Sequence, residues 1–221
     1  MSSPSRQILT DGARQLGLVL EPTALERLLL YYAELLKWNR KINLVAQAPE
    51  PELLETHFLD SLTLLPLLSP VPTPDPLALL DIGSGAGFPG LVLKCCLPER
   101  LDVTLVEPRQ KRVAFLRQVV RTVGLGAGVR VLAQRLEPGE SGSWPLITSR
   151  AFASMADFLA LCAGLSTPGG RVICMKGPRA EEELALWQQQ DQAELFRLEE
   201  VRSLSLPFSG AARHLLVFQR R

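Results

Sequence analysis

The chain has 221 residues, of which 47% are hydrophobic and 21% charged, as in a globular protein of one domain with at most a small appendage. Its 24 basic and 23 acidic residues give a net charge of +1, so any nucleic-acid contact requires a local basic patch. No apolar run reaches the roughly 20 residues that span a bilayer, and the four cysteines lack zinc-site spacing. We therefore expect a cytoplasmic protein with reduced thiols and no metal.

The N-terminal part of the chain carries helical patterns. A weak one surrounds Ile8–Leu16. A stronger helix is predicted to begin at Thr23, with Glu26 completing a capping box, and to end near Trp38–Arg40. A third helix is expected over Glu52–Leu68, because apolar residues recur there at helical spacing.

Four prolines, at positions 70, 72, 74 and 76, follow these helices. Such a run is incompatible with a helix or a central strand and makes a stiff linker. We therefore predict a helical N-terminal extension over residues 1–69, a linker over 70–76 and an α/β domain over 77–221.

The α/β domain alternates strand and helix patterns. Strands or extended segments are predicted at Leu77–Ile82, Asp102–Val106, Val129–Leu132, Leu146–Ser149, Arg171–Met175, Leu195–Leu204 and Arg213–Gln219. Helices are predicted at Phe88–Cys96, Lys111–Val123, Ser154–Gly164 and Ala180–Gln190. This alternation predicts a doubly wound, mainly parallel sheet that binds its ligand beyond the carboxyl ends of the strands.

A glycine-rich turn follows the first strand, and it can be read in two ways. Gly85-x-Gly87-x-x-Gly90 fits a dinucleotide-binding pattern. Asp81-x-Gly83-x-Gly85-x-Gly87 resembles motif I of S-adenosylmethionine (SAM) methyltransferases. The strand should end at Ile82, which favours the second reading, with Asp81 facing a ligand amino group. We also expect the N–H groups that open the next helix to add an electropositive patch.

Two further segments lie where a nucleoside cofactor would need them. Glu107 ends the second strand about 20 residues beyond the loop, where a carboxylate can accept both ribose hydroxyls in either cofactor class. Gln134–Glu137 follows the third strand, so a side chain there can cover an adenine ring and Glu137 can read its amino edge.

Several motifs make the resemblance more specific. They are Asn39-x-x-x-Asn43-Leu44, His57-Phe-Leu-Asp-Ser-Leu62, Asp81-Ile-Gly-Ser-Gly-Ala-Gly-Phe-Pro-Gly90, Lys111-Arg-Val-x-Phe-Leu-Arg117, Ser149-Arg-Ala-Phe-Ala-Ser154, Met175-Lys-Gly-Pro178 and Arg213-His-Leu215. From about residue 20 onward the chain closely resembles the RsmG (GidB) family. The resemblance implies a class I SAM-dependent methyltransferase with a Rossmann-like, seven-stranded sheet and a helical extension. It also implies methylation of guanine N7 in the 530 loop of 16S rRNA, at position 527 in the usual rRNA numbering.

The predicted cofactor residues combine both lines of reasoning. The resemblance implies contacts from Gly83, Phe88, Leu136, Glu137 and Arg150, and the spacing adds Asp81, Gly85 and Glu107. Guanine N7 is already an unprotonated acceptor, so no catalytic base is predicted.

Three basic residues are predicted to contact RNA, namely Lys176, Arg179 and Arg213. His57 and Asp60 lie three residues apart, a spacing that allows a shared hydrogen bond, and a capping or interdomain structural role is as good an interpretation of the pair as contact with RNA. The expected partner is 16S rRNA or the small ribosomal subunit, and the expected state is a monomer. Two alternatives remain, a dinucleotide-dependent oxidoreductase and a non-catalytic RNA- or protein-binding module on the same fold.

Overall fold

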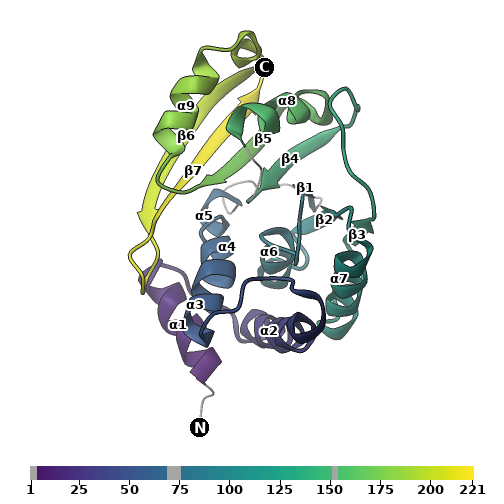
Figure 1. The fold of residues 1–221 in the computed structure, drawn as a ribbon, viewed down its shortest axis with the longest axis vertical. Coiled ribbons are helices and arrows are strands. Elements are labelled where there is room, and N and C mark those ends of the chain that lie inside the picture. Colours follow the sequence, from purple (N-terminus) through teal and green to yellow (C-terminus); the bar gives the residue numbers. More distant parts are fainter. Residues whose placement is uncertain (1–3, 69–75, 151–153) are drawn as a thin grey trace.

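The computed structural model describes residues 4–68, 76–150 and 154–221. Within them, seven strands form one sheet in the order β3-β2-β1-β4-β5-β7-β6 (Figure 1). The strands are β1 Leu77–Ile82, β2 Leu101–Val106, β3 Val129–Leu132, β4 Trp144–Ser149, β5 Ser166–Lys176, β6 Phe196–Ser205 and β7 Ala212–Arg220. The pairings among β1 to β5 are parallel, and β7 runs antiparallel to both β5 and β6. The predicted doubly wound, mainly parallel sheet is confirmed.

Helices cover both faces of this sheet. The helices of the α/β part are α6 Gly90–Cys96, α7 Gln110–Thr122, α8 Met155–Leu165 and α9 Ala180–Gln188, with a 3₁₀ turn, η2, at Asp191–Leu195. Successive strand residues point to opposite faces. Leu79 therefore joins the core beneath α6 and α7, and Leu80 joins the core beneath α8 and α9. The continuous apolar sequence of β1 follows from this burial on both faces.

The first two helices are α1 Pro4–Gln15 and α2 Pro22–Ile42. The predicted capping box at Thr23 is wrong, because Glu21 is the N-cap, no side chain caps the helix, and Pro22 occupies its first turn. The helix also runs past Arg40. It ends where Asn43 adopts a left-handed conformation, φ 42°, and Asn39 Oδ1 accepts the Leu44 N–H at 2.6 Å.

The third predicted helix is divided. Its segments are α3 Glu50–Leu53, the π-helix η1 Leu54–Leu59, α4 Asp60–Leu62 and α5 Leu65–Leu68. The wider π turn occurs where Glu55 and Asp60, each 3% exposed, bind residues at the β7 end of the sheet. Apolar periodicity does not reveal such a turn, which is frequent at functional sites.

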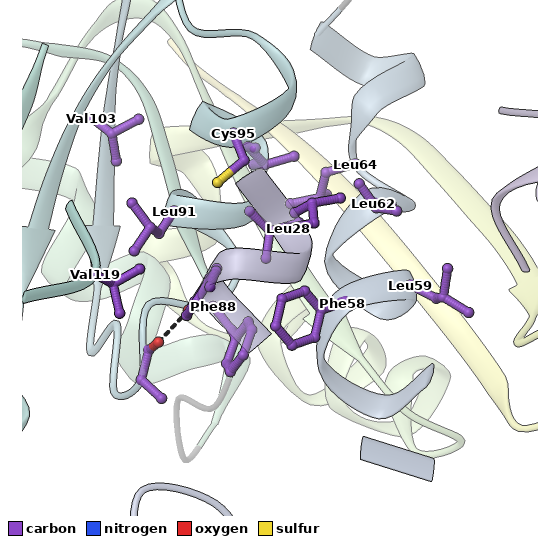
Figure 2. Close-up of a cluster of buried hydrophobic side chains, with 14 of the residues drawn as sticks. Leu28, Phe58, Leu59, Leu62, Leu64, Phe88, Leu91, Cys95, Val103 and Val119 are labelled. Carbon is purple, nitrogen blue, oxygen red and sulfur yellow. Dashed lines mark hydrogen bonds between the residues drawn. The ribbon is translucent and has the colours of Figure 1, made fainter. Parts of the chain in front are cut away.

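The N-terminal helices and the sheet share one buried cluster. It contains Tyr31 of α2, Phe58 of η1, Phe88 of the glycine-rich turn and Leu105 of β2, and Figure 2 shows Phe58 and Phe88 beside Leu28 and Leu91. The division of the chain at the proline run stays a prediction, since residues 70–75 of that linker lie outside the described residues.

Two other boundaries differ from expectation. Helix α6 begins at Gly90 rather than Phe88, because Pro89 is its N-cap. Strand β5 begins at Ser166 rather than at the predicted Arg171, next to an irregular register with β4. Among the described residues, no helix combines the length and apolarity needed to cross a membrane.

Candidate active site

The glycine-rich turn after β1 needs its glycines for two different reasons. Gly83, Gly85 and Gly87 have φ values of 70°, 58° and 96°, which L side chains rarely adopt. A Cβ on Gly83 would meet no atom within 4 Å, whereas one on Gly87 would lie 2.6 Å from Tyr31 Oη. Gly83 therefore faces open space, and Gly87 lets α2 approach the turn.

A cavity of about 420 Å³ adjoins Gly83 beyond the carboxyl ends of β1 and β2, a volume suited to a small ligand. Its lining comprises Ile82, Gly83, Val106, Pro108, Gln134, Arg135, Leu136, Glu137, Pro138, Asp157, Ala160 and Leu161. Gly83, Leu136 and Glu137 are thus brought together, though their contact with a cofactor stays a prediction. Sequence reasoning missed the three residues of α8. The position of that helix after the neighbouring strand β4 is the signal that could have found them.

Asp81 lies at the base of the turn and is fully buried. Its Oδ2 accepts the Gly90 N–H at 2.9 Å, while its Oδ1 has no hydrogen-bond partner among the described residues. Burial raises the pKa of this carboxyl to about 7. Because buried polar atoms are almost always satisfied, the vacant oxygen fits a ligand that brings a hydrogen-bond donor, such as the amino group of SAM.

The backbone N–H groups of the glycine-rich turn form hydrogen bonds within the protein. The N–H groups of Gly87 and Phe88 both donate to Ser84 O, and the Gly90 N–H is taken by Asp81. The predicted electropositive patch at the start of α6 is therefore wrong. The physical reason is that the acid and the turn satisfy those donors internally.

Glu107 forms hydrogen bonds to two loops, the glycine-rich turn and the segment that precedes α7. Its Oε2 accepts the Gly85 N–H at 3.1 Å and its Oε1 accepts the Arg109 N–H at 2.8 Å. Arg112 adds an ion pair at 3.7 Å. The side chain is 4% exposed, and its neighbours Val106 and Pro108 line the cavity while it does not. Its predicted contact with ribose remains a prediction beside this observed loop-fixing role.

Phe88 was expected to line the pocket, and its position corrects that expectation. Its ring is 3% exposed and stacks between Tyr31 and His57, with centroid distances of 5.4 and 5.0 Å. Phe58 meets it edge-on at 5.3 Å. Phe88 thus joins the turn to the N-terminal helices, because the aromatic residues of α2 and η1 fold over it.

Tyr31 completes this connection, and sequence reasoning missed it. Its hydroxyl donates to the carbonyl oxygen of Ala86, within the turn. Burial raises its pKa well above the usual value, so it remains a donor. The only signal in the sequence was an aromatic residue on the helix.

Replacing Tyr31 by phenylalanine should lower the free energy of unfolding by about 1–3 kcal/mol, because the buried Ala86 carbonyl loses its donor. Urea unfolding measures the change. Tyr32→Phe is the matched control, since the Tyr32 hydroxyl forms no hydrogen bond to the described residues. Equal stabilities for the two variants would contradict the anchoring role of Tyr31.

Arg150 lies directly after β4, and its side chain contacts two residues of η1 and the Phe88 ring. It donates to Thr56 O at 2.7 Å and to His57 Nδ1 at 3.0 Å, and its guanidinium lies 4.9 Å from the Phe88 ring centre. Arginine only donates, so Nδ1 accepts and His57 carries its proton on Nε2. Burial and the Arg150 charge lower the pKa of His57 to about 3. His57 is therefore neutral at physiological pH.

Asp60 does not share a hydrogen bond with His57, contrary to the prediction. It accepts from Arg213 Nε at 3.0 Å and lies 3.8 Å from Arg150 Nη1. Two arginines from distant strands outcompete the nearby imidazole because the buried carboxylate needs positive charge.

A second cavity, of about 400 Å³, lies around these arginines. Its lining comprises Thr56, Asp60, Arg150, Met175, Lys176, Gly177 and Arg213. Three cations and one carboxylate give it positive character, although Lys176 also pairs with Glu183 at 2.8 Å. Lys176 and Arg213 are thus brought together, whereas Arg179 is exposed at the start of α9 and lies outside the lining. Their contact with RNA stays a prediction.

Two kinds of site therefore lie at the carboxyl edge of the sheet. The first is an apolar cavity beside the glycine-rich turn, and Asp81, with its unpaired Oδ1, lies buried at the base of that turn and outside the cavity lining. The second is a basic cavity suited to an anionic group. Among the described residues, no cluster of three His, Cys, Asp or Glu residues is arranged to hold a metal ion.

The chain matches known proteins over most of its length. The GidB family model, described as rRNA small subunit methyltransferase G, matches residues 24–216. The ribosomal RNA small subunit methyltransferase G of Desulfotalea psychrophila is 44% identical over 216 residues, covering 96% of each chain. That of Myxococcus xanthus is 43% identical over 217 residues, covering 96% of this chain and 95% of the relative. A SAM-dependent methyltransferase structure from Aquifex aeolicus shares the fold, with TM-score 0.53, 20% identity and coverage of 76% of this chain and 93% of that one.

Proposed function

This chain belongs to the family of rRNA small subunit methyltransferase G, and from that premise we propose that it methylates N7 of a guanine in the 530 loop of 16S rRNA, with SAM as the donor. The guanine is the one at position 527 in the usual rRNA numbering. The observation that carries this proposal is the buried Asp81 with a vacant oxygen, at the base of an open glycine turn.

The cofactor residues suit SAM in two ways. Asp81 Oδ1 offers an acceptor to the amino group of its methionine part. The cavity walls formed by Ile82, Leu136 and Leu161 suit an adenine ring, and Glu137 lies beside them to read its amino edge. SAM supplies a methyl group already activated by a sulfonium.

The residues of the chain then have to position the guanine. N7 carries a free lone pair and has no proton to lose, so no general base is needed. This agrees with the neutral His57, whose pKa is about 3. The basic cavity around Arg150, Lys176 and Arg213 is the proposed site of the target nucleotide. Alignment of two reactants can supply about 7–11 kcal/mol of the barrier.

Two measurements test the proposal. Calorimetric titration with SAM and with NAD should show binding of SAM alone, and tight NAD binding without SAM binding would favour the oxidoreductase alternative instead. Small subunits from cells that lack this enzyme should then accept one methyl group from radiolabelled SAM. Mass mapping of the RNA should place it on guanine N7 in the 530 loop, and a methyl group on another nucleotide would refute the assignment.

A further inference from the structure

We propose that Phe208, in the turn between β6 and β7, stacks on an RNA base next to the target guanine. This inference rests on the proposed function. It assigns a binding role to a residue outside both cavities described above and defines a path for the RNA strand.

A third cavity, of about 430 Å³, places Phe208 near the proposed guanine site. Its lining comprises Pro51, Glu52, Glu55, Thr56, Leu206, Phe208, Ser209, Ala211 and Arg213. Thr56 and Arg213 also line the basic cavity, so the two cavities adjoin. A strand with one nucleotide in the basic cavity can therefore place its neighbour against Phe208.

The turn that carries Phe208 is held in place. Glu55 Oε1 of η1 accepts the N–H groups of Phe208 and Ser209, the latter at 3.0 Å. Within the turn, the Leu206 and Gly210 N–H groups donate to Ala211 O and Leu206 O, each at 3.0 Å. Figure 1 shows the turn at the lower left, beside α1 and α3. The π-helix thus fixes the turn through a buried carboxylate.

Phe208 is nevertheless 45% exposed. Nearly half of its surface therefore stays in water, and that half contributes nothing to apolar burial in the folded protein. A rigid, half-exposed ring is instead the usual platform for an unstacked base.

The basic cavity and the third cavity differ in charge, and this difference suits the phosphates and the bases of a nucleotide strand. Lys176 and Arg213 face the basic cavity, where phosphates can lie. The third cavity adds Phe208 and the carboxylate of Glu52, which can accept from the amino group of a base. Basic residues beside an exposed aromatic ring are typical of single-stranded RNA binding.

A series of substitutions at Phe208 tests the stacking. With methyl-deficient small ribosomal subunits as substrate, Phe208→Ala should raise KM roughly 5- to 150-fold at nearly unchanged kcat. Phe208→Leu should resemble the alanine variant, because it keeps apolar contact but loses the ring. Phe208→Trp should retain a KM close to that of the wild type.

Several controls separate stacking from misfolding and from charge. Leu186→Ala removes an apolar side chain that is 58% exposed and lies outside the linings of the three cavities, so it should leave KM unchanged. The Kd for SAM should be the same in all Phe208 variants. The dependence of log KM on log salt should keep its slope in Phe208→Ala, whereas Lys176→Gln should reduce the slope by about one.

The outcomes also separate this inference from the proposed function. If wild-type protein methylates the subunits but Phe208→Ala keeps the wild-type KM, the stacking role is refuted and the function stands. If Phe208→Leu behaves as the wild type while Phe208→Ala is weak, the contact needs only an apolar side chain and no ring, which also overturns stacking. If wild-type protein transfers no methyl group to the subunits, the proposed function itself fails.

Discussion

Replacement of Arg150 by alanine is expected to lower the free energy of unfolding by about 3 kcal/mol and to remove most methyl transfer. The guanidinium is the donor to Thr56 O and to His57 Nδ1, and it helps to neutralise Asp60. Without it, the part-buried Thr56 carbonyl and the buried Asp60 carboxylate each lose a partner. The expected loss is at the lower end of values for broken buried ion pairs, because Arg213 still binds Asp60 at 3.0 Å.

The loss of activity has a separate cause. Arg150 lies over the Phe88 ring, at 4.9 Å from its centre, and Phe88 continues the glycine-rich turn. The Arg150 charge also lowers the pKa of Asp81, which favours the ionised acid. Its removal should therefore loosen the turn and weaken SAM binding together.

Two matched variants separate these effects. Arg213→Ala removes the closer partner of Asp60 but no contact to His57 or Phe88, so it should destabilise the protein while leaving the Kd for SAM unchanged. Arg150→Lys keeps the charge but not the forked donors, and it should fall between wild type and alanine. Urea unfolding and calorimetry with SAM give both quantities. Equal SAM affinity for Arg150→Ala and wild type would contradict the role of Arg150.

The N-terminal helices thus take part in the site. Tyr31 and Phe88 stack at 5.4 Å, and the Tyr31 hydroxyl binds the Ala86 carbonyl. His57 and Thr56 receive Arg150 from the sheet. Movement of these helices relative to the sheet would therefore be transmitted to the glycine-rich turn, which we propose to bind SAM.

The sequence predicted what depends on local patterns. The end of β1 at Ile82 follows from an apolar run that meets a glycine, and the placing of Gly83 at the cavity follows from the strand end. The alternation of strands and helices likewise predicted a doubly wound, mainly parallel sheet, because short connections of this kind allow few topologies.

The features that sequence reasoning missed depend on residues far apart in the chain. The stacking of Phe88 joins segments more than 50 positions apart, and Asp60 binds an arginine 153 positions away. Nothing in the local sequence of His57 or Asp60 indicates these partners, so their spacing suggested a bond to each other. The π turn has the same origin, since its stabilising contacts come from Arg213 and the turn at Phe208.

Replacement of Asp81 by asparagine is expected to weaken SAM binding about 10- to 150-fold at pH 7.5 and yet stabilise the free protein. Asparagine keeps the shape and can still accept the Gly90 N–H through its oxygen. It loses the negative charge that would meet the SAM amino group. Because the vacant Oδ1 is fully buried, that charge is costly without the ligand.

The pH dependence separates these two effects. The folded-state pKa of Asp81 is raised from 3.8 to about 7, so its contribution to stability is fully present below the unfolded pKa and is lost as pH rises through about 7. The affinity for SAM should instead increase as pH rises, because the ionised acid is the form that attracts an ammonium group. Between about pH 5.5 and 7, the Kd for SAM should fall by up to tenfold per pH unit.

Asp81→Asn should remove both trends. Its Kd for SAM should stay flat over this range, and its free energy of unfolding should exceed that of the wild type most clearly above pH 7. Calorimetry and urea unfolding at matched pH values measure the two quantities. Ser84→Ala is the matched comparison, because it keeps the carboxylate but removes a side chain that donates to Asp81 O at 2.8 Å and lowers the pKa of the carboxyl, so both trends should persist and move to higher pH. A wild-type Kd that does not change with pH would show that Asp81 does not bind the SAM amino group as an ionised acid.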